Sequence, residues 1–529
     1  MQPSHHDLAI VLAIVAFATA LLALSPRVRI PYPILLVLGG LALGFFPGMP
    51  SVQLPPQAVL VGILPPLLYS SAFFTSLRDL RANTRPIGLL SIGLVMTTTV
   101  SVAAVAHTIV PGISWPAGFV LGAIVSPTDP IAATTIAERL GVPRRIVTII
   151  EGESLLNDGT ALVAYKFAVA AVVSGTFAAG HASLVFVWVV IGGVATGLVA
   201  GWLIRQVRRR LDNPPVEITI ALMTGYFAFI PADLIGVSGV LAVVTAGVYV
   251  GWHTPELTTA QTRMQGDAVW EILTFLLNAL LFMLVGMQLR GILDALSGRS
   301  TGSLVEAAVV VSAAVIAVRF VWVFPATYVP RALSRRIRER DPYPPWQYPA
   351  MISWSGMRGA VSLAAALALP LHTDAGAFDA RPMILFLTFA VILATLVIQG
   401  LSMPLVIRAL GLEADDIADR EEVKARIHAA EAALARIEEL AGEDWVRDDT
   451  ADRLRRFYQF RRSRFAARFG DGDDGGVEER SARYQRLVRE LLGAEREALL
   501  GLRRSGVISD DTMRRVQRDL DLEEARLDA

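Results

Sequence analysis

Apolar runs long enough to cross a membrane recur along the first 410 residues of this chain. In the hydrocarbon core of a bilayer every backbone polar group must bond within the protein, so such runs fold as helices. The sequence therefore predicts an all-α, polytopic membrane protein. Thirteen spans are expected, at residues 8–24, 30–47, 57–75, 86–110, 116–138, 145–174, 183–204, 216–231, 235–252, 268–289, 303–329, 347–371 and 382–408.

Composition divides the chain into two parts. A hydrophobic fraction of 53%, a charged fraction of 18% and a mean hydropathy of +0.51 are typical of a membrane protein rather than of a soluble enzyme. Most of the 48 acidic residues nevertheless lie after residue 411. We therefore expect a transmembrane domain over residues 1–411 and a small helical tail over residues 412–529, with a regulatory or dimer-stabilising role.

Arginine clusters predict how the spans are oriented. With the N-terminus outside, the clusters at residues 27–29, 78–85, 144–145, 205–210 and 331–340 all lie on the cytoplasmic side, and the opposite loops are almost free of arginine. An odd number of spans then places the tail in the cytoplasm. We expect a multi-pass protein of the inner (plasma) membrane, whose first apolar run is a membrane helix rather than a cleaved signal.

Two predicted spans are interrupted near their centres. Pro127 and Pro130 flank Thr128 and Asp129 in span 5, and two glycines surround Arg358 in span 12. Unwound backbone is tolerated at membrane depth only where it lines a cavity or is buried in protein. With span 7 as a linker, the broken spans occupy matching places in two halves, as in secondary transporters built from inverted repeats. Asp129 is expected to offset the positive half-helix ends and Arg358 the negative ones.

Span 6 carries carboxylates that a lipid-facing helix would not retain, because a charge at the bilayer centre costs at least about 2.5 kcal/mol. Asp158 and Ser154 share one helix face, which offers hard oxygen ligands for a small cation. Asp129 of span 5 is the alternative ion-carrying carboxylate.

The other charged residues of span 6 need partners. Glu153 faces away from Asp158 and needs a cation, for which Arg319 of span 11 is the first candidate and Arg358 the second. Lys166 either extends toward the membrane interface or responds to the charge of Asp158. Four further polar residues within the predicted spans are expected to be helix-packing or interfacial groups, namely Asn278, Gln399, Asp233 and Glu271.

Three ordered motifs resemble those of monovalent cation:proton antiporters of the NhaP and sodium/hydrogen-exchanger type, in particular a bacterial branch with a cytoplasmic tail. The motifs are Ser126-Pro-Thr-Asp-Pro130, Gly152-Glu-Ser-Leu-Leu-Asn-Asp158 and Gly356-Met-Arg-Gly-Ala-Val-Ser362. The resemblance implies a homodimer in which each protomer has a dimerisation domain and a moving core, the core carrying the crossed spans 5 and 12 and span 6. It also implies that Asp158 binds cation or proton, with Asn157, Ser154 and Thr128 as ligands or orienting groups.

One position departs from the family pattern. Many relatives have a glutamate after the aromatic residue of span 3, where this chain has Ser70 after Tyr69. Selectivity among Na⁺, Li⁺ and K⁺ is therefore not transferable from the family. Because Asn157 is neutral where electrogenic relatives carry an aspartate, we predict electroneutral one-for-one exchange, in which the cation and H⁺ compete for Asp158.

Other classes of function are weighed against this prediction. A cation channel or a helical membrane sensor gated by the tail would need no titrating carboxylate and no counter-ion. An intramembrane enzyme is disfavoured because Ser154 and Lys166 lie ~18 Å apart along one helix. The chain has no cysteine, no nucleotide-binding loop and no histidine pair at metal spacing. We therefore expect a secondary transporter with no cofactor and no nucleic-acid partner.

Overall fold

A computed structural model describes residues 5–28, 30–46, 58–174, 179–296, 298–374, 376–412, 417–467 and 477–528. Within these residues the chain is helical apart from its connections and one short antiparallel hairpin, β1 (His372–Thr373) with β2 (Gly376–Ala377). The chain divides into two compact units, Met1–Ala414 and Asp415–Ala529. This division lies three residues beyond the predicted one.

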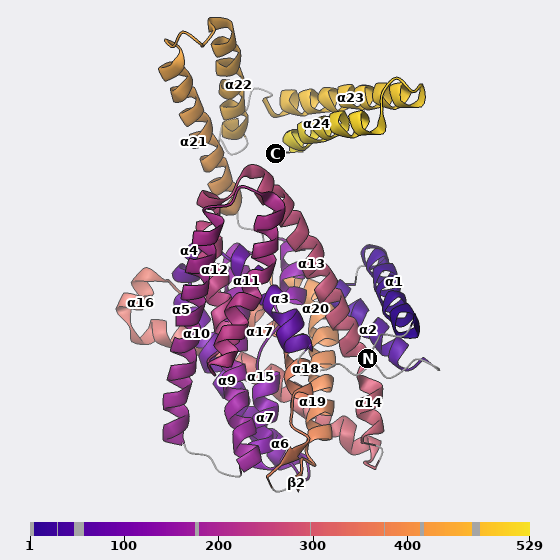
Figure 1. Ribbon diagram of the computed structural model, residues 1–529. Coiled ribbons are helices and arrows are strands. Elements are labelled where there is room, and N and C mark those ends of the chain that lie inside the picture. The colour runs from indigo at the N-terminus through magenta and orange to yellow at the C-terminus, as the bar shows by residue number, and fades with distance from the viewer. Residues whose placement is uncertain are drawn as a thin grey trace. The chain divides into compact units, whose positions relative to one another are not determined.

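The first unit is a helical bundle whose elements follow the predicted apolar runs (Figure 1). Its first part contains α1 (His5–Val28), α2 (Tyr32–Gly44), η1 (Ala58–Ile63), α3 (Leu64–Phe74), α4 (Leu77–Ala82), α5 (Thr84–Gly88), η2 (Leu89–Leu94), α6 (Val95–Ile109), α7 (Trp115–Val125), α8 (Ile131–Arg139), α9 (Arg144–Ser174) and α10 (Ala179–Arg208). Its second part contains α11 (Pro214–Leu234), α12 (Gly239–Leu257), α13 (Ala260–Met287), α14 (Leu289–Asp294), α15 (Thr301–Leu333), α16 (Arg335–Arg340), α17 (Gln347–Trp354), α18 (Ala360–Leu367), α19 (Arg381–Ala394), η3 (Thr395–Gln399) and α20 (Gly400–Ala409).

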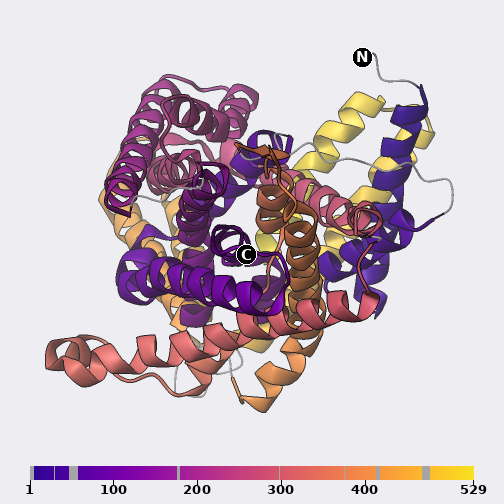
Figure 2. The same ribbon diagram turned by 90° about the horizontal axis from the view of Figure 1, so that it is seen from below.

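The helices support the prediction of a polytopic membrane protein. Among the described residues, seven helical segments are individually long and apolar enough to cross a membrane. Most of the other predicted spans are short or broken helices, and the total of thirteen stays a prediction. Helices α10, α11 and α12 pack against one another as one group, which Figure 2 shows in the colours of residues 179–257.

Both predicted interruptions are present. Helix α7 ends at Val125 and α8 begins at Ile131, while α17 ends at Trp354 and α18 begins at Ala360. The two unwound segments meet, since the Asp129 N–H donates to the Met357 carbonyl oxygen at 2.8 Å. Each segment thus satisfies a backbone group of the other, which is a condition for non-helical chain within a membrane protein.

Helices α2 and α13 approach each other through glycines. A Cβ atom added at Gly40 would lie 2.1 Å from the Met283 carbonyl oxygen, and one added at Gly286 would lie 2.1 Å from the Val37 carbonyl oxygen. Small residues permit such close contact between membrane helices. The contact holds α13 against the bundle beside the candidate site.

The second unit consists of four helices, α21 (Ile417–Leu440), α22 (Asp448–Ala467), α23 (Val477–Arg504) and α24 (Asp510–Asp528). Helix α21 packs on α22 and α23 packs on α24, as two hairpins. A few apolar side chains are buried in each hairpin, among them Val423, Ala430 and Phe465 in the first and Leu492 and Leu520 in the second. The unit therefore has a small core of its own.

Candidate functional site

A cavity of about 90 Å³ lies where the unwound segments meet α9. Leucines of α3 and α13 form part of its apolar wall. Its polar side chains come from five different elements or connections of the bundle. They are Ser71, Thr128, Asp129, Ser154, Asp158, Asn278 and Ser362. A cavity with several oxygen-bearing side chains inside a membrane bundle suits a small cation.

Asp158 contributes a carboxylate that has no partner in the described part of the protein. Its residue is only 7% exposed, it lines the cavity, and it forms no hydrogen bond or ion pair with another described residue. Ser154, one helical turn earlier on α9, lines the same cavity. The shared face expected from helical periodicity is therefore the face that meets the cavity.

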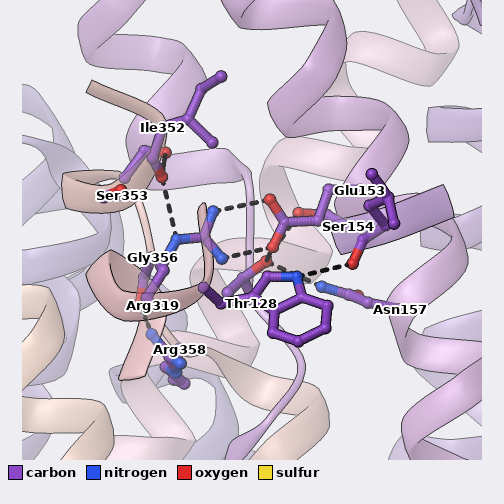
Figure 3. A network of polar contacts seen from close by, with 12 residues as sticks. Thr128, Glu153, Ser154, Asn157, Arg319, Ile352, Ser353, Gly356 and Arg358 are labelled. Atoms are coloured by element: carbon purple, nitrogen blue, oxygen red, sulfur yellow. Dashed lines mark hydrogen bonds and ion pairs between the residues drawn. The ribbon is translucent and has the colours of Figure 1, made fainter. Parts of the chain in front are cut away.

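Glu153 forms a buried ion pair with Arg319 of α15. The Arg319 guanidinium donates from Nη2 to Glu153 Oε2 at 2.7 Å and from Nη1 to Oε1, and both side chains are at most 2% exposed. Arg319 Nε also donates to the Ile352 carbonyl oxygen at 2.9 Å (Figure 3). Each charge therefore has a partner of opposite sign, and neither is buried without compensation.

A hydrogen-bond network connects this ion pair to the unwound segment of span 5 (Figure 3). Asn157 Nδ2 donates to Thr128 Oγ1 at 2.9 Å, and the same hydroxyl lies 3.3 Å from Glu153 Oε1 and 3.3 Å from Ser154 Oγ. Asn157 is 1% exposed and does not line the cavity. The structure thus places Asn157 behind the cavity, where it orients Thr128.

Asp129 and Arg358 lie at helix ends. Asp129 Oδ1 accepts a hydrogen bond from the Ile131 N–H at 3.0 Å, at the start of α8. Arg358 Nε donates to the Val125 carbonyl oxygen at 3.0 Å, at the end of α7, and its Nη1 donates to the Gly356 carbonyl oxygen. An acid thus lies at a helix N-terminus and a cation at C-terminal carbonyls, which is the arrangement that offsets helix dipoles.

Lys166 forms an ion pair that the sequence analysis did not anticipate. Its Nζ lies 3.8 Å from Asp233 Oδ1 of α11, and both side chains are more than half exposed. Lys166 does not line the cavity that contains Asp158. An exposed pair at this distance contributes little to stability.

Sequence reasoning missed three cavity residues. Asn278 of α13 was assigned to helix packing, and Ser362 of α18 appeared only as the end of a motif. On α3 the cavity is lined by Ser71, while Ser70, which replaces the family's glutamate, is buried outside that lining. No local signal marks these residues, because each reaches the cavity only through the packing of helices that are distant in sequence.

A carboxylate that is buried and unpaired within the described residues, beside two broken helices that meet, is typical of a membrane ion transporter. Comparison with known proteins identifies the family. The family model described as "sodium/hydrogen exchanger, transmembrane" matches residues 12–409 of this chain. A protein of Mycobacterium tuberculosis named as an uncharacterized Na⁺/H⁺ exchanger is 38% identical over 98% of this chain and 96% of its own length. This chain belongs to the sodium/hydrogen exchanger family, which consists of transporters and not enzymes.

Two further similar proteins are informative, one for the transported ions and one for the fold. A sodium, potassium, lithium and rubidium/H⁺ antiporter of Bacillus pumilus is 32% identical over 71% of this chain and 57% of its own length. The solved structure of the sodium proton antiporter MjNhaP1 from Methanocaldococcus jannaschii at pH 8 superimposes with a TM-score of 0.59. The two chains are 18% identical, and the match covers 75% of this chain and 100% of MjNhaP1. The first unit therefore has the antiporter fold.

Proposed function

We propose that this protein is a secondary antiporter that exchanges Na⁺ for H⁺ across the plasma membrane by alternating access, with Asp158 binding either ion in turn. The observation that carries the proposal is the free carboxylate of Asp158 on the cavity. The other acids nearby are engaged, since Glu153 is paired with Arg319 and Asp129 accepts a backbone N–H.

Competition for one carboxylate is sufficient to couple the two ions. A bare carboxylate is costly to move through a region of low dielectric constant, whereas a carboxylate neutralised by Na⁺ or by H⁺ is not. Only the loaded forms of the moving core then cross between the two sides. Each passage in one direction carries a cation, and each return carries a proton.

The charge balance of the site supports electroneutral, one-for-one exchange. The charge of Glu153 is cancelled by Arg319, the charge of Asp129 is offset by the N-terminus of α8, and Asn157 carries no charge. One titrating group therefore accounts for one cation or one proton in each half-cycle. Li⁺ and K⁺ are further candidate substrates of this protein. Both ions appear in the name of the related antiporter of Bacillus pumilus.

Topology and assembly are part of the proposal. Thirteen spans with the N-terminus outside would place the basic clusters and the tail in the cytoplasm. The homodimer implied by the family resemblance would use a dimerisation domain that stays fixed in the lipid bilayer while the core moves. The alternative, a cation channel or sensor gated by the tail, could use the acid to attract cations but would not need it to exchange a proton.

The proposal is tested by transport in proteoliposomes that contain the purified full-length protein, a pH-sensitive dye and an imposed pH gradient. Adding Na⁺ should dissipate the gradient for the wild type, and Asp158→Asn should abolish this response. Asp233→Asn, which removes an exposed acid outside the cavity, serves as the matched control and should stay active. Exchange retained by Asp158→Asn would reject the assignment.

Membrane potential separates the antiporter from the channel. An electroneutral exchanger should dissipate the pH gradient at the same rate whether or not the potential is clamped, and it should produce no net current on a solid-supported membrane. A sustained cation current without a proton counter-flow would instead identify a channel.

A further inference from the structure

We propose that Asn278 of α13, acting with the hydroxyl of Ser362, is a further ion-binding residue and sets which monovalent cation the site prefers. This inference rests on the proposed function and deepens it. It changes the role of Asn278 from a helix-packing amide to a ligand contributed by a helix outside the three sequence motifs.

The residues predicted from the motifs do not by themselves provide enough free oxygen atoms. A cation that has lost its water needs several oxygen ligands in its place. The Thr128 hydroxyl already accepts a hydrogen bond from Asn157 and lies within bonding distance of Glu153 and Ser154. Apart from the two carboxylate oxygens of Asp158 and the second oxygen of Asp129, the motif residues of α9 and span 5 therefore contribute few uncommitted oxygens.

Asn278 has the burial and the position of a ligand. It is 8% exposed, it lines the cavity that contains Asp158, and its amide forms no hydrogen bond with the described residues. The atoms of this amide are not fully enclosed by protein, so the amide oxygen is open to the cavity. An ion held between α9 and α13 would bind this oxygen as a ligand.

Ser362 supplies the second, independent observation. Ser362 is 0% exposed, and its Oγ has no hydrogen-bond partner in the described structure. The residue lines the same cavity from α18. Two unpaired polar side chains from separate helices thus border the cavity of one unpaired carboxylate. This arrangement points to a shared ligand rather than to two unrelated packing defects.

Both proposed ligands are neutral, and this has a consequence for selectivity. An amide and a hydroxyl add oxygen without adding charge, so one cation still balances one proton. Discrimination among Na⁺, Li⁺ and K⁺ would then depend on how closely α13 approaches α9. The position of α13 is held by its glycine contacts with α2, at Gly40 and Gly286.

The experiment compares matched variants of the full-length protein. Asn278→Leu removes the amide at the cavity, and Gln399→Leu removes an amide that is also buried and unpaired but does not line the cavity. Ser362→Ala is matched in the same way by Ser312→Ala of α15, whose hydroxyl is buried and unpaired. Each variant is assayed for the KM of Na⁺, Li⁺ and K⁺ in proteoliposomes. Stabilisation of the purified protein by each cation, measured as a shift in melting temperature, reports binding directly.

Asn278→Leu should raise the KM for Na⁺ by about tenfold, the effect of losing one polar contact to a charged group. It should also change the KM ratio of Na⁺ to K⁺ and reduce the Na⁺-induced shift in melting temperature, with the maximal rate largely retained. Ser362→Ala should act in the same direction but less strongly. Both controls should match the wild type.

The inference is overturned if Asn278→Leu and Gln399→Leu have the same KM values and the same cation-induced shifts. If Asn278→Leu does not fold, Asn278→Ala removes the amide without adding bulk, and wild-type KM ratios in that variant would overturn the inference as well. Failure of the proposed function looks different. In that case even the wild type would show no cation-coupled proton movement, and this inference would be overturned with it.

Discussion

At the scale of single residues, the site shows how two carboxylates of one helix acquire opposite roles. Glu153 and Asp158 both lie on α9 and both are buried. Glu153 meets the guanidinium of Arg319, while Asp158 meets a cavity. Helical periodicity separates their faces, and the neighbours of each face then decide which acid is paired with a guanidinium and which faces the cavity.

Removing one partner of the buried ion pair should be costly. Glu153→Gln leaves the Arg319 charge buried without a partner, so we expect a loss of about 3–5 kcal/mol of stability. The double variant Glu153→Gln/Arg319→Met should recover part of this loss. Thermal unfolding of the purified protein in detergent measures both effects. A single variant as stable as the wild type would contradict the assigned pairing.

At the scale of secondary-structure elements, the function depends on where helices break and on how closely they pack. Prolines in span 5 and glycines in span 12 predict the breaks, and the structure places unwound chain at both. The meeting of the two unwound segments is a tertiary feature, since it depends on the bond between the Asp129 N–H and the Met357 carbonyl. The close contact of α2 with α13 is tertiary in the same sense.

Helix packing can be tested with two glycines. Gly286→Ala would place its Cβ atom 2.1 Å from the Val37 carbonyl oxygen, and a backbone atom cannot turn aside as a side chain can. We expect overpacking to lower stability by about 1–3 kcal/mol. Gly291→Ala is the control, because a Cβ atom there would meet nothing within 4 Å. The melting temperatures of the two variants should differ, and equal values would contradict the close contact.

Asp341 connects three helices at the loop between α16 and α17. It accepts hydrogen bonds from Arg85 at 2.6 Å, Arg145 at 2.7 Å and Arg331 at 2.7 Å. These arginines belong to α5, α9 and α15. Burial by itself would raise the pKa of Asp341, but the hydrogen bonds and charges of Arg145 and Arg331 lower it below its usual value. The ionised carboxylate therefore stabilises the junction.

The sign of this pKa shift sets the expected pH dependence. Because the pKa of Asp341 is lower in the folded state, its contribution is complete above the unfolded-state pKa of about 4 and is lost as the pH falls through the folded-state value. Asp341→Asn should cost about 1–3 kcal/mol at neutral pH, since the arginines lose their common partner. The difference in melting temperature from the wild type should shrink below about pH 4.

A matched control for Asp341→Asn is available on α16. Glu339 forms an ion pair with Arg335 in which both side chains are highly exposed, at 62% and 84%. Glu339→Gln should therefore leave the melting temperature nearly unchanged. Equal effects of the two substitutions, or a difference for Asp341→Asn that grows in acid, would show that the Asp341 contacts do not stabilise the protein.

At the scale of the whole molecule, the chain consists of a membrane unit and a separate helical unit. The cavity, the ion pair and the crossed segments all lie within residues 1–414. The tail packs its own apolar side chains in two hairpins. The parts needed for ion exchange are therefore expected to function without the tail, which would modulate exchange or stabilise a dimer.

Truncation after residue 414 tests this division. The shortened protein should fold and retain Na⁺-dependent proton exchange in proteoliposomes, because no cavity-lining residue is removed. Its rate and its pH profile are compared with those of the full-length protein in the same lipid. A monodisperse truncated protein without exchange would show that the tail belongs to the transport machinery.

Much of this architecture could be predicted because its signals are local. Apolar runs predict helices, prolines and glycines predict breaks, and helical spacing assigns Ser154 and Asp158 to one face. The partners of isolated charges were harder to predict. Lys166 pairs with Asp233, a contact between helices that no sequence pattern relates.

The sequence by itself determined that the chain spans a membrane, where two helices unwind, and that Ser154 and Asp158 share one face of α9. Only the tertiary structure decided that Asp158 has no partner among the residues it describes, that Thr128 is occupied by Asn157, and which side chains of distant helices complete the cavity. The physical reason is the distance along the chain over which each effect acts. Hydrophobicity and helical period act over a few residues, whereas a cavity is defined by side chains that meet only after the helices have packed.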